Sequence, residues 1–236
     1  MVIKRLFYLF VLLFTAALVS YGQKTEVDFN AYSGLFSFRG KGGTVNSWIN
    51  FNPYVMPQKY TSNPYGKKSS LSYAVELKVQ RVTKSKNIFG SGLCFEELTS
   101  KVNIDTVTEN GFIYYQHPAN GKTTLKNTYI TVNPFMGHRY SVGKRTLDLL
   151  AGVDAAFCLK SREQGSGTTK NNGSTTVDNN RAKPVVDFRP RVQIATKLNG
   201  FNLLAGYSIG LTNYQDKYHS NAYTSFVRVG VGYQLK

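Results

Sequence analysis

The sequence predicts an all-β fold, an eight-stranded antiparallel up-and-down transmembrane β-barrel that is preceded by a cleaved signal peptide. Three observations predict it. The composition combines 14% aromatic residues and 21 glycines with 42% hydrophobic residues, which is typical of a sheet protein and too polar for a bundle of membrane helices. After an N-terminal apolar run, nearly every segment alternates between apolar and polar residues. The connections between these segments are alternately short and long, as in an outer-membrane barrel.

The N-terminus has the features of a secretory signal peptide. Lys4 and Arg5 precede an apolar run from Leu6 to Val19, and small residues follow the run. The run of fourteen residues is shorter than the roughly 20 that a membrane-spanning helix needs. We therefore expect residues 1–22 to be a cleaved signal peptide and residues 23–236 to form one barrel domain.

Four segments in the first part of the chain have the alternation of strands with unlike faces. In the first segment, Val27 and Phe29 share one face, while Asp28 and Asn30 share the other. The next three segments repeat this pattern, with charged residues on the polar face. The four expected strands are 26–38, 71–80, 89–96 and 124–140.

Four further segments complete the barrel. In the last, Val227 and Val229 alternate with Arg228, and Asn199-Gly200 between two others is a strong signal for a tight hairpin. Pro190 lacks a backbone N–H, so we expect a local irregularity in its strand. Each segment is long enough to cross a bilayer at a tilt. The four expected strands are 147–160, 186–198, 201–211 and 223–235.

The connections predict the orientation of the barrel. Short links fall near 84–87, 142–144 and 199–200, and in an outer-membrane barrel such turns face the periplasm. The stretch 165–176 is rich in Gly, Ser, Thr and Asn, and we expect it to be mobile. The long polar loops on the outer side are expected at 39–70, 102–122, 161–183 and 212–221.

Alternation alone does not say which face lies inside the barrel, but the charges do. The polar face carries both signs, and an eight-stranded interior is just wide enough to be filled by side chains. Opposite charges can pair there, which offsets the desolvation that each would suffer alone. We therefore expect a plugged lumen, and not an open pore. The predicted lumen charge network consists of Glu76, Lys78, Glu96, Asp148, Asp154, Arg189, Arg191 and Arg228.

The C-terminal strand carries a pattern that resembles the insertion signal of bacterial outer-membrane barrels. In such barrels the assembly machinery recognises this strand by pairing with its edge, so we expect that machinery to be a partner during insertion. The final Lys236 departs from the usual aromatic end. The predicted signal residues are Arg228, Gly230, Tyr233 and Leu235.

The order of motifs in the last half of the chain resembles the PorT-like outer-membrane β-barrel domain family. The resemblance rests on 129–134, 143–152, 186–188, 203–213 and 229–233, and the first half matches only by its strand rhythm. It implies a barrel in the bacterial outer membrane and permits a role in a secretion or transport assembly. None of these motifs is catalytic.

Residues that could carry chemistry are few and scattered. His117, His138 and His219 have no partner at a spacing typical of metal ligands, so we expect no metal and no cofactor. Cys94 and Cys158 are expected to face inward from strands that another strand separates. Because neighbouring strands lie about 4.8 Å apart, we expect two buried thiols and no disulfide.

Two short patterns leave chemistry open at the outer rim. His219 lies near Asp216 and Ser220, the only cluster that could support a barrel enzyme acting on lipid or peptide. Asp105-Thr106-Val107 resembles a bacterial O-glycosylation sequon, and the sequence does not decide whether it is modified.

The charge balance points to anionic partners outside the cytoplasm. The formal net charge is +16, but a signal peptide and a barrel exclude nucleic acid as the partner. The first long loop carries basic residues and aromatic rings but no acid. It is either a solvated loop or a contact for outer-membrane lipid such as lipopolysaccharide or for an envelope protein. Its basic residues are Arg39, Lys41, Lys59, Lys67 and Lys68.

These features together predict a non-enzymatic, small outer-membrane barrel that acts as a structural or interaction protein through its outer loops. The alternative is an accessory subunit of an envelope secretion or transport assembly. A barrel enzyme built on the His219 region is a third hypothesis.

Overall fold

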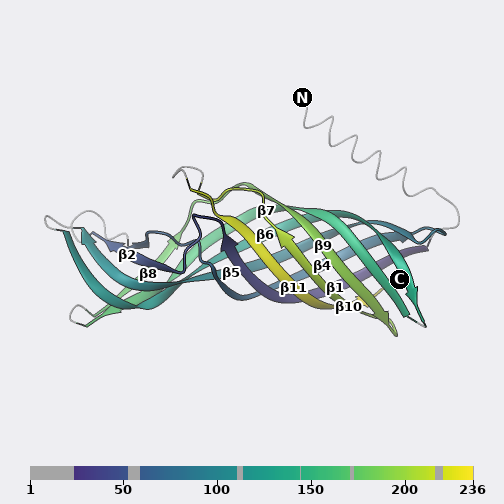
Figure 1. Cartoon of the computed structure of the whole chain (residues 1–236), viewed down its shortest axis with the longest axis horizontal. Coiled ribbons are helices and arrows are strands. Elements are labelled where there is room, and N and C mark those ends of the chain that lie inside the picture. Colours follow the sequence, from purple (N-terminus) through teal and green to yellow (C-terminus); the bar gives the residue numbers. More distant parts are fainter. Residues whose placement is uncertain are drawn as a thin grey trace, which may run out of the picture.

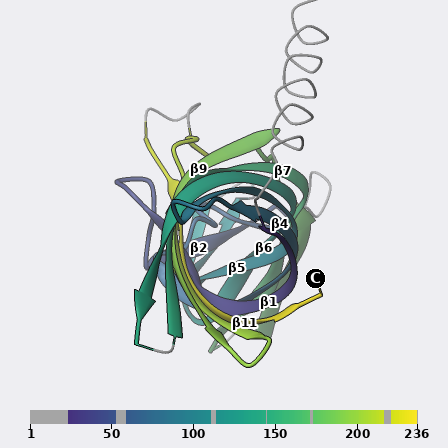
Figure 2. The same ribbon diagram turned by 90° about the vertical axis from the view of Figure 1, so that its right-hand side faces the viewer.

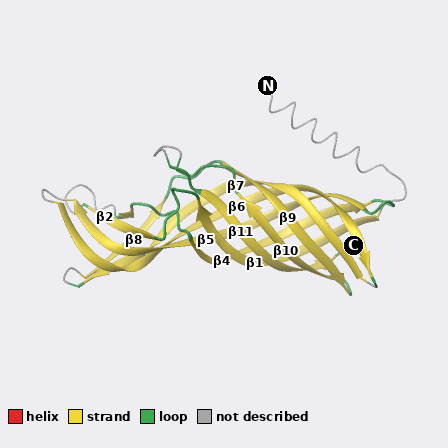
Figure 3. Ribbon diagram, in the orientation of Figure 1, coloured by secondary structure: helices red, strands yellow, loops and turns green. Residues whose placement is uncertain are grey.

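The computed structural model describes residues 24–52, 59–110, 114–143, 145–170, 173–215 and 220–235. The predicted signal peptide, residues 1–22, lies outside the described residues. In the described part of the chain no helix is long and apolar enough to cross a membrane. The described residues form eleven β-strands joined by turns and loops, so the prediction of an all-β fold is confirmed (Figure 3).

Eight of the strands form a closed antiparallel ring. The backbone pairing follows the order β5-β4-β1-β11-β10-β9-β7-β6, and β6 pairs with β5 to complete the ring. Every ring strand lies beside its sequence neighbours within the ring, which is the up-and-down topology, and Figure 2 views the ring from its turn end. The ring strands are β1 (Lys24–Arg39), β4 (Lys68–Val82), β5 (Asn87–Asn110), β6 (Tyr114–Val142), β7 (Arg145–Thr169), β9 (Val186–Leu198), β10 (Phe201–Ile209) and β11 (Tyr223–Gln234).

Short turns join the strands at one end of the ring. Asn199 and Gly200 both adopt positive φ, 50° and 88°, as a two-residue hairpin turn of type I′ requires. The turn between β4 and β5 uses Lys86 at φ 63°, and Thr83 closes it with a backbone hydrogen bond to Asn87 of 2.9 Å. Both chain ends of the ring, at Lys24 and Gln234, lie at this turn end (Figure 1).

The irregularity predicted at Pro190 affects one side of its strand only. Pro190 pairs with Val153 of β7 without a shift in register. The ladder between β9 and β10, however, ends at Arg191. Because Pro190 has no N–H to donate, the pairing with β10 stops beside it.

The strands β5, β6 and β7 continue well beyond the ring, at the end away from the C-terminus (Figure 1). There β2 (Asn46–Phe51) pairs with β5, β3 (Tyr60–Thr61) pairs with β2, and β8 (Gly173–Asn180) pairs with β7. We call β2, β3, β8 and the ends of β5, β6 and β7 beside them the outer unit. It has a hydrophobic core of its own, formed by Ile49, Val102, Ile104, Val107 and Val177.

Three of the predicted loops contain strands of the outer unit. Residues 102–122 and 161–183 are wrong as loops, since most of them belong to β5, β6, β7 and β8, and the stretch expected to be mobile forms the β7–β8 hairpin. Loop 39–70 contains β2 and β3. The polar stretches are rich in threonine, which favours strands, and a few alternating apolar side chains suffice to give them a core. In loop 212–221, the described residues form no strand.

A buried carboxylate holds the outer unit together. Glu163 of β7 is fully buried and accepts a hydrogen bond of 3.0 Å from the backbone N–H of Thr61. Arg181 lies 3.5 Å from the same carboxylate and donates to the carbonyl of Thr61 at 3.1 Å. Burial raises the pKa of Glu163, against the opposing effects of Thr61 and Arg181. The connection between β2 and β4, which carries β3, is therefore bound to β7 through Glu163 and to the segment between β8 and β9 through Arg181.

Candidate functional site

The two faces of the ring strands have opposite character, with the charges inside. Along β4, Glu76 and Lys78 are 1% and 2% exposed, while Leu77 between them is 47% exposed. The same holds around the whole ring, where large apolar side chains cover the outside. All eight residues of the predicted charge network are buried, each no more than 4% exposed: Glu76, Lys78, Glu96, Asp148, Asp154, Arg189, Arg191 and Arg228.

Six of these residues form one connected network in the middle of the lumen. Glu96 contacts both Arg189 and Arg228, the second at 3.2 Å. Asp154 lies 3.2 Å from Arg228 and 3.5 Å from Arg191. Arg191 reaches Glu76 at 3.2 Å. Three carboxylates and three guanidinium groups therefore balance one another in the interior.

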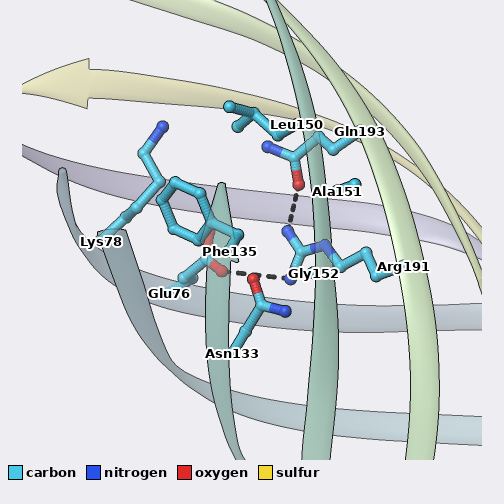
Figure 4. Close-up of a pocket in the computed structure, with 9 residues that line it drawn as sticks. All are labelled: Glu76, Lys78, Asn133, Phe135, Leu150, Ala151, Gly152, Arg191 and Gln193. Carbon is cyan, nitrogen blue, oxygen red and sulfur yellow. Dashed lines mark hydrogen bonds and ion pairs between the residues drawn. The ribbon is translucent and has the colours of Figure 1, made fainter. Parts of the chain in front are cut away.

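Neutral side chains extend this central network. Tyr32 and Asn30 donate to Glu76 at 2.6 Å and 2.9 Å, and Arg191 also donates to Gln193 (Figure 4). The Arg228 guanidinium lies 4.4 Å from the ring centre of Phe226. Such partners occupy donors and acceptors that would otherwise be buried without a hydrogen bond.

The other two predicted residues lie nearer the turn end and belong to separate pairs. Lys78 forms an ion pair of 3.0 Å with Asp28. Asp148 is held by Arg139 through two hydrogen bonds of 2.7 Å. Arg139 also donates to Glu26 at 2.9 Å and 3.0 Å, so it bridges two buried carboxylates.

Sequence reasoning missed Glu26, Arg139 and Lys197, which together form this turn-end cluster. Lys197 contacts Glu26 at 2.5 Å. Glu26 and Arg139 each lie on the inward face by the strand period, which was the signal that could have found them. They stand at strand ends, where membership of the lumen is hardest to infer from alternation.

Apolar layers lie on either side of the central network. Towards the turn end, Val82, Ile88, Phe135 and Leu150 form a cluster. The space between this cluster and the central network is a cavity of about 10 Å³ (Figure 4). A cavity of that size is about the minimum for one water molecule. Its lining includes Glu76, Lys78, Asn133, Phe135, Arg191 and Gln193.

The second apolar layer lies at the outer mouth of the ring. Tyr214, from the connection between β10 and β11, donates or accepts a hydrogen bond of 2.7 Å with Tyr129. Its ring meets those of Phe38 and Tyr65 edge-on, at 5.1 Å and 6.1 Å between centroids. Part of the predicted loop 212–221 therefore folds into the barrel. The buried cluster here comprises Phe36, Phe38, Leu98, Leu125, Tyr129, Ala156, Cys158, Ala222 and Phe226.

The predicted insertion-signal residues all lie in or just after β11. Arg228 is part of the central network, and Gly230 lies against Tyr32, whose ring would be 2.6 Å from a Cβ at position 230. Tyr233 faces outward and packs edge-on against Phe201 at 5.4 Å. The Leu235 N–H donates to the Val27 carbonyl at 2.7 Å. Each residue thus has a structural role in closing the ring.

The five basic residues of the first long loop do not form one cluster. Arg39 donates to the Gly210 carbonyl at 3.0 Å and lies over the Tyr223 ring, at the mouth of the barrel. Lys59 lies over the Phe51 ring in the outer unit. Lys68 donates to Asn103 at 2.8 Å. Lys41 and Lys67 are exposed.

The remaining candidate residues are dispersed. His117 stacks on Tyr115, and His138 shares a hydrogen bond of 2.9 Å with Asn87. Asp216 and His219 of the possible enzyme cluster lie outside the described residues. Within the described parts, no group of three or more His, Cys, Asp or Glu side chains could hold a metal ion.

Two further sequence features have defined surroundings. Cys94 and Cys158 are free and buried, as the spacing of their strands predicts. Thr106 donates to Asp105 at 3.1 Å, beside a register shift in β5. Asp105 is exposed.

No protein-family model matches the chain, so the resemblance to the PorT-like family rests on the quoted motifs alone. No curated protein sequence matches the chain.

Among solved structures, the chain is similar to Neisserial surface protein A, at 10% identity and a TM-score of 0.37, over 90% of this chain and 98% of that one. It is also similar to the attachment invasion locus protein of Yersinia pestis, solved with the heparin analogue sucrose octasulfate. There the identity is 9% and the TM-score 0.36, over 90% of this chain and 99% of that one. A Pseudomonas aeruginosa FadL homologue matches at 7% identity and a TM-score of 0.21, over 89% of this chain and 90% of that one. Similarity at this level defines neither the family nor the function of the chain.

Proposed function

We propose that the protein is a non-enzymatic β-barrel of the bacterial outer membrane. One observation carries this proposal, the inverted polarity of the ring. Side chains such as Phe29, Phe89 and Leu93 are about half exposed on the outside, while charged groups fill the inside. In water an apolar surface around the whole ring would drive aggregation, whereas a closed ring without free edges suits a hydrocarbon environment.

The lumen is proposed to be plugged. Three layers support this proposal: the apolar layer of Val82 and Ile88, the central ion network, and the aromatic layer at Tyr214. Ion pairs and rings that span the interior leave little free volume between the two ends. A barrel closed in this way does not conduct, so its activity is expected at its surface.

The outer unit is proposed to be the interaction module. It is a folded β-structure with its own core, held by Glu163, and it presents a fixed surface beyond the barrel. Outer-membrane lipid or an envelope protein would be its partner, and the assembly machinery a transient partner during insertion. The resemblance to the PorT-like family keeps the alternative of an accessory subunit of a secretion or transport assembly. Purification in mild detergent separates the two, because a subunit should bring stoichiometric partners.

The first prediction concerns location. After cell fractionation the mature chain is expected in the outer-membrane fraction, and its mobility on a denaturing gel is expected to change on boiling. Closed barrels resist detergent until heated because every backbone group is paired within the ring. Recovery of the mature chain in the soluble periplasm, with no change in mobility on boiling, would contradict the proposal.

The second prediction concerns conductance. Pure folded protein in planar bilayers is expected to give no stable current steps, because the interior of an eight-stranded barrel is about as wide as the side chains it holds. The matched control is a Tyr214→Ala variant, which removes one ring from the mouth but leaves the ion network in place. It is expected to remain silent as well. Large, stable steps from the unmodified chain would refute the plugged lumen.

A further inference from the structure

The apolar outer surface of the barrel ends at one level on β5, β6 and β7. Phe95, Ile130 and Phe157 are paired neighbours on these strands, and all three are at least 40% exposed. Two or three residues further towards the outer unit, the neighbours on the same face are Glu97, Thr128 and Lys160. The surface therefore changes from apolar to charged within one row of side chains.

Beyond this boundary, the outward face carries a group of basic residues, which we call the basic strip. They come from four neighbouring strands, β4 to β7, of which β5, β6 and β7 continue into the outer unit (Figure 1). Among the described residues two carboxylates pair with them, Glu97 with Lys126 at 2.8 Å and Asp178 with Arg162 at 2.6 Å. The basic strip consists of Lys68, Lys101, Lys122, Lys126, Lys160 and Arg162.

The strip places like charges directly opposite one another. Lys68 faces Lys101 across the β4–β5 ladder, and Lys126 faces Arg162 across the β6–β7 ladder. Directly opposed side chains in antiparallel strands have Cβ atoms about 5 Å apart, and like charges there destabilise the pair. Within the described residues, no carboxylate forms an ion pair with Lys101, Lys122 or Lys160. Glu97 and Asp178 offset the repulsion at Lys126 and Arg162. At Lys101, Lys122 and Lys160 a multivalent anion would supply the missing negative charge.

We propose that the basic strip binds the phosphate groups of an outer-leaflet lipid headgroup. This proposal rests on the proposed location in the outer membrane. The adjoining Phe95, Ile130 and Phe157 favour an amphipathic ligand over a soluble anion, since acyl chains would cover these side chains while the phosphates meet the strip. From Lys126 to Lys122 the strip runs about 13 Å along the strand, and it spans about 14 Å across four strands. These dimensions fit a headgroup with more than one phosphate.

The proposal also relocates the predicted lipid contact. Of the five basic residues in the first long loop, only Lys68 belongs to the strip, while Arg39 and Lys59 face aromatic rings elsewhere. Three of the six strip residues, Lys68, Lys122 and Arg162, lie in stretches that the sequence pattern assigned to loops.

The test measures lipid retention on the mature chain folded in detergent micelles. Bis-phosphorylated lipid A, its dephosphorylated form and phosphatidylcholine are titrated separately, and bound lipid is counted by native mass spectrometry. The strip variant is Lys101→Gln/Lys122→Gln/Lys160→Gln. The matched control, Lys84→Gln/Lys86→Gln/Arg145→Gln, removes the same charge from exposed residues at the turn end.

Bis-phosphorylated lipid A is expected to bind the strip variant about tenfold more weakly or worse, while the control keeps its affinity within about twofold. Raising sodium chloride from about 50 to about 300 mM should weaken lipid A binding by the unmodified chain more than lipid A binding by the strip variant. Equal losses in both variants, no loss in the strip variant, or equal binding of dephosphorylated lipid A would overturn the proposal. Tripolyphosphate binding as tightly as lipid A would overturn the assignment to a lipid.

Two controls keep this result separate from folding and from location. The boiling-dependent gel shift reports whether each variant is folded, and the single variant Lys101→Gln, expected to bind about threefold more weakly, replaces the triple if the triple fails to fold. Cell fractionation tests the outer-membrane location independently. If the chain fractionates with the outer membrane but does not bind the phosphorylated lipid, the proposal of lipid binding by the basic strip is wrong and the proposed location stands.

Discussion

Replacing Arg189 with Met is expected to lower the free energy of unfolding by about 3–5 kcal/mol. Arg189 is fully buried and contacts Glu96, which is also fully buried, and it lies 3.9 Å from Asp154. Met fills a similar volume, so the loss comes mainly from leaving carboxylate charge in a low-dielectric interior with one cation fewer. Titration with guanidinium chloride in detergent, with the folded fraction read from the gel shift, measures the change in the free energy of unfolding.

A second substitution tests the physical cause. The double variant Arg189→Met/Glu96→Gln restores charge balance in the central network and is expected to regain part of the lost stability. Lys84→Met, at an exposed position in a turn, serves as the surface control and should change the free energy of unfolding by less than about 0.5 kcal/mol. If the double variant were less stable than the sum of its single changes predicts, the charge-balance explanation would be wrong.

The ring itself could be predicted because its strands follow a period of two over most of their length, despite register shifts at Ser69/Tyr73 and Thr128/Tyr129. Once the charges on one face are placed inside, the position of Glu76 or Arg228 follows from counting by two. All eight predicted lumen residues are buried, and the sign of each charge indicates whether its partner is acidic or basic. Which carboxylate meets which arginine could not be predicted, since it depends on the stagger between strands that are far apart in sequence.

The outer unit and the mouth of the barrel could not be predicted in the same way. Residues 161–183 are polar and low in complexity, and their strand structure depends on Val177 packing against Ile49 and Ile104 from other segments. Tyr214 enters the mouth because Phe38 and Tyr65 provide a surface for its ring. Such contacts between loop segments leave no periodic pattern in the sequence, so they cannot be predicted from it.

The distribution of acids explains why the exterior is so basic. Seven buried carboxylates lie in the lumen and an eighth, Glu163, in the core of the outer unit, which together account for eight of the thirteen Asp and Glu residues. In the lumen six of the seven form ion pairs with buried or half-buried cations. The formal charge of +16 therefore comes from residues outside the lumen, including Lys4 and Arg5 of the expected signal peptide. Because the buried charges nearly cancel, the excess of basic residues lies outside the lumen.

Deleting Tyr233–Lys236 is expected to nearly abolish assembly of the barrel in cells. The deletion removes the pairs that Tyr233 makes with Phe29 and Phe201 on the two neighbouring strands, and the bond of Leu235 to Val27. It also removes the end of the strand that resembles the insertion signal. The amount of heat-modifiable protein in the outer-membrane fraction, set against total expressed protein, measures assembly.

Loss of stability and loss of the signal predict different results in a second setting. Refolding of the purified chain into detergent needs no assembly machinery, and only the last rungs of a twelve-residue strand are missing, so the truncated chain is expected to fold there with most of its normal yield. The matched control, Leu203→Ala/Tyr207→Ala, removes outward apolar side chains from the neighbouring β10 at positions that pair with Val231 and Val227, outside the deleted segment. It should assemble in cells and refold in detergent to similar extents. If the truncated chain failed in detergent as completely as in cells, its defect would be one of barrel closure, and the terminal motif would need no recognition role. If it assembled normally in cells, the motif would not be the signal.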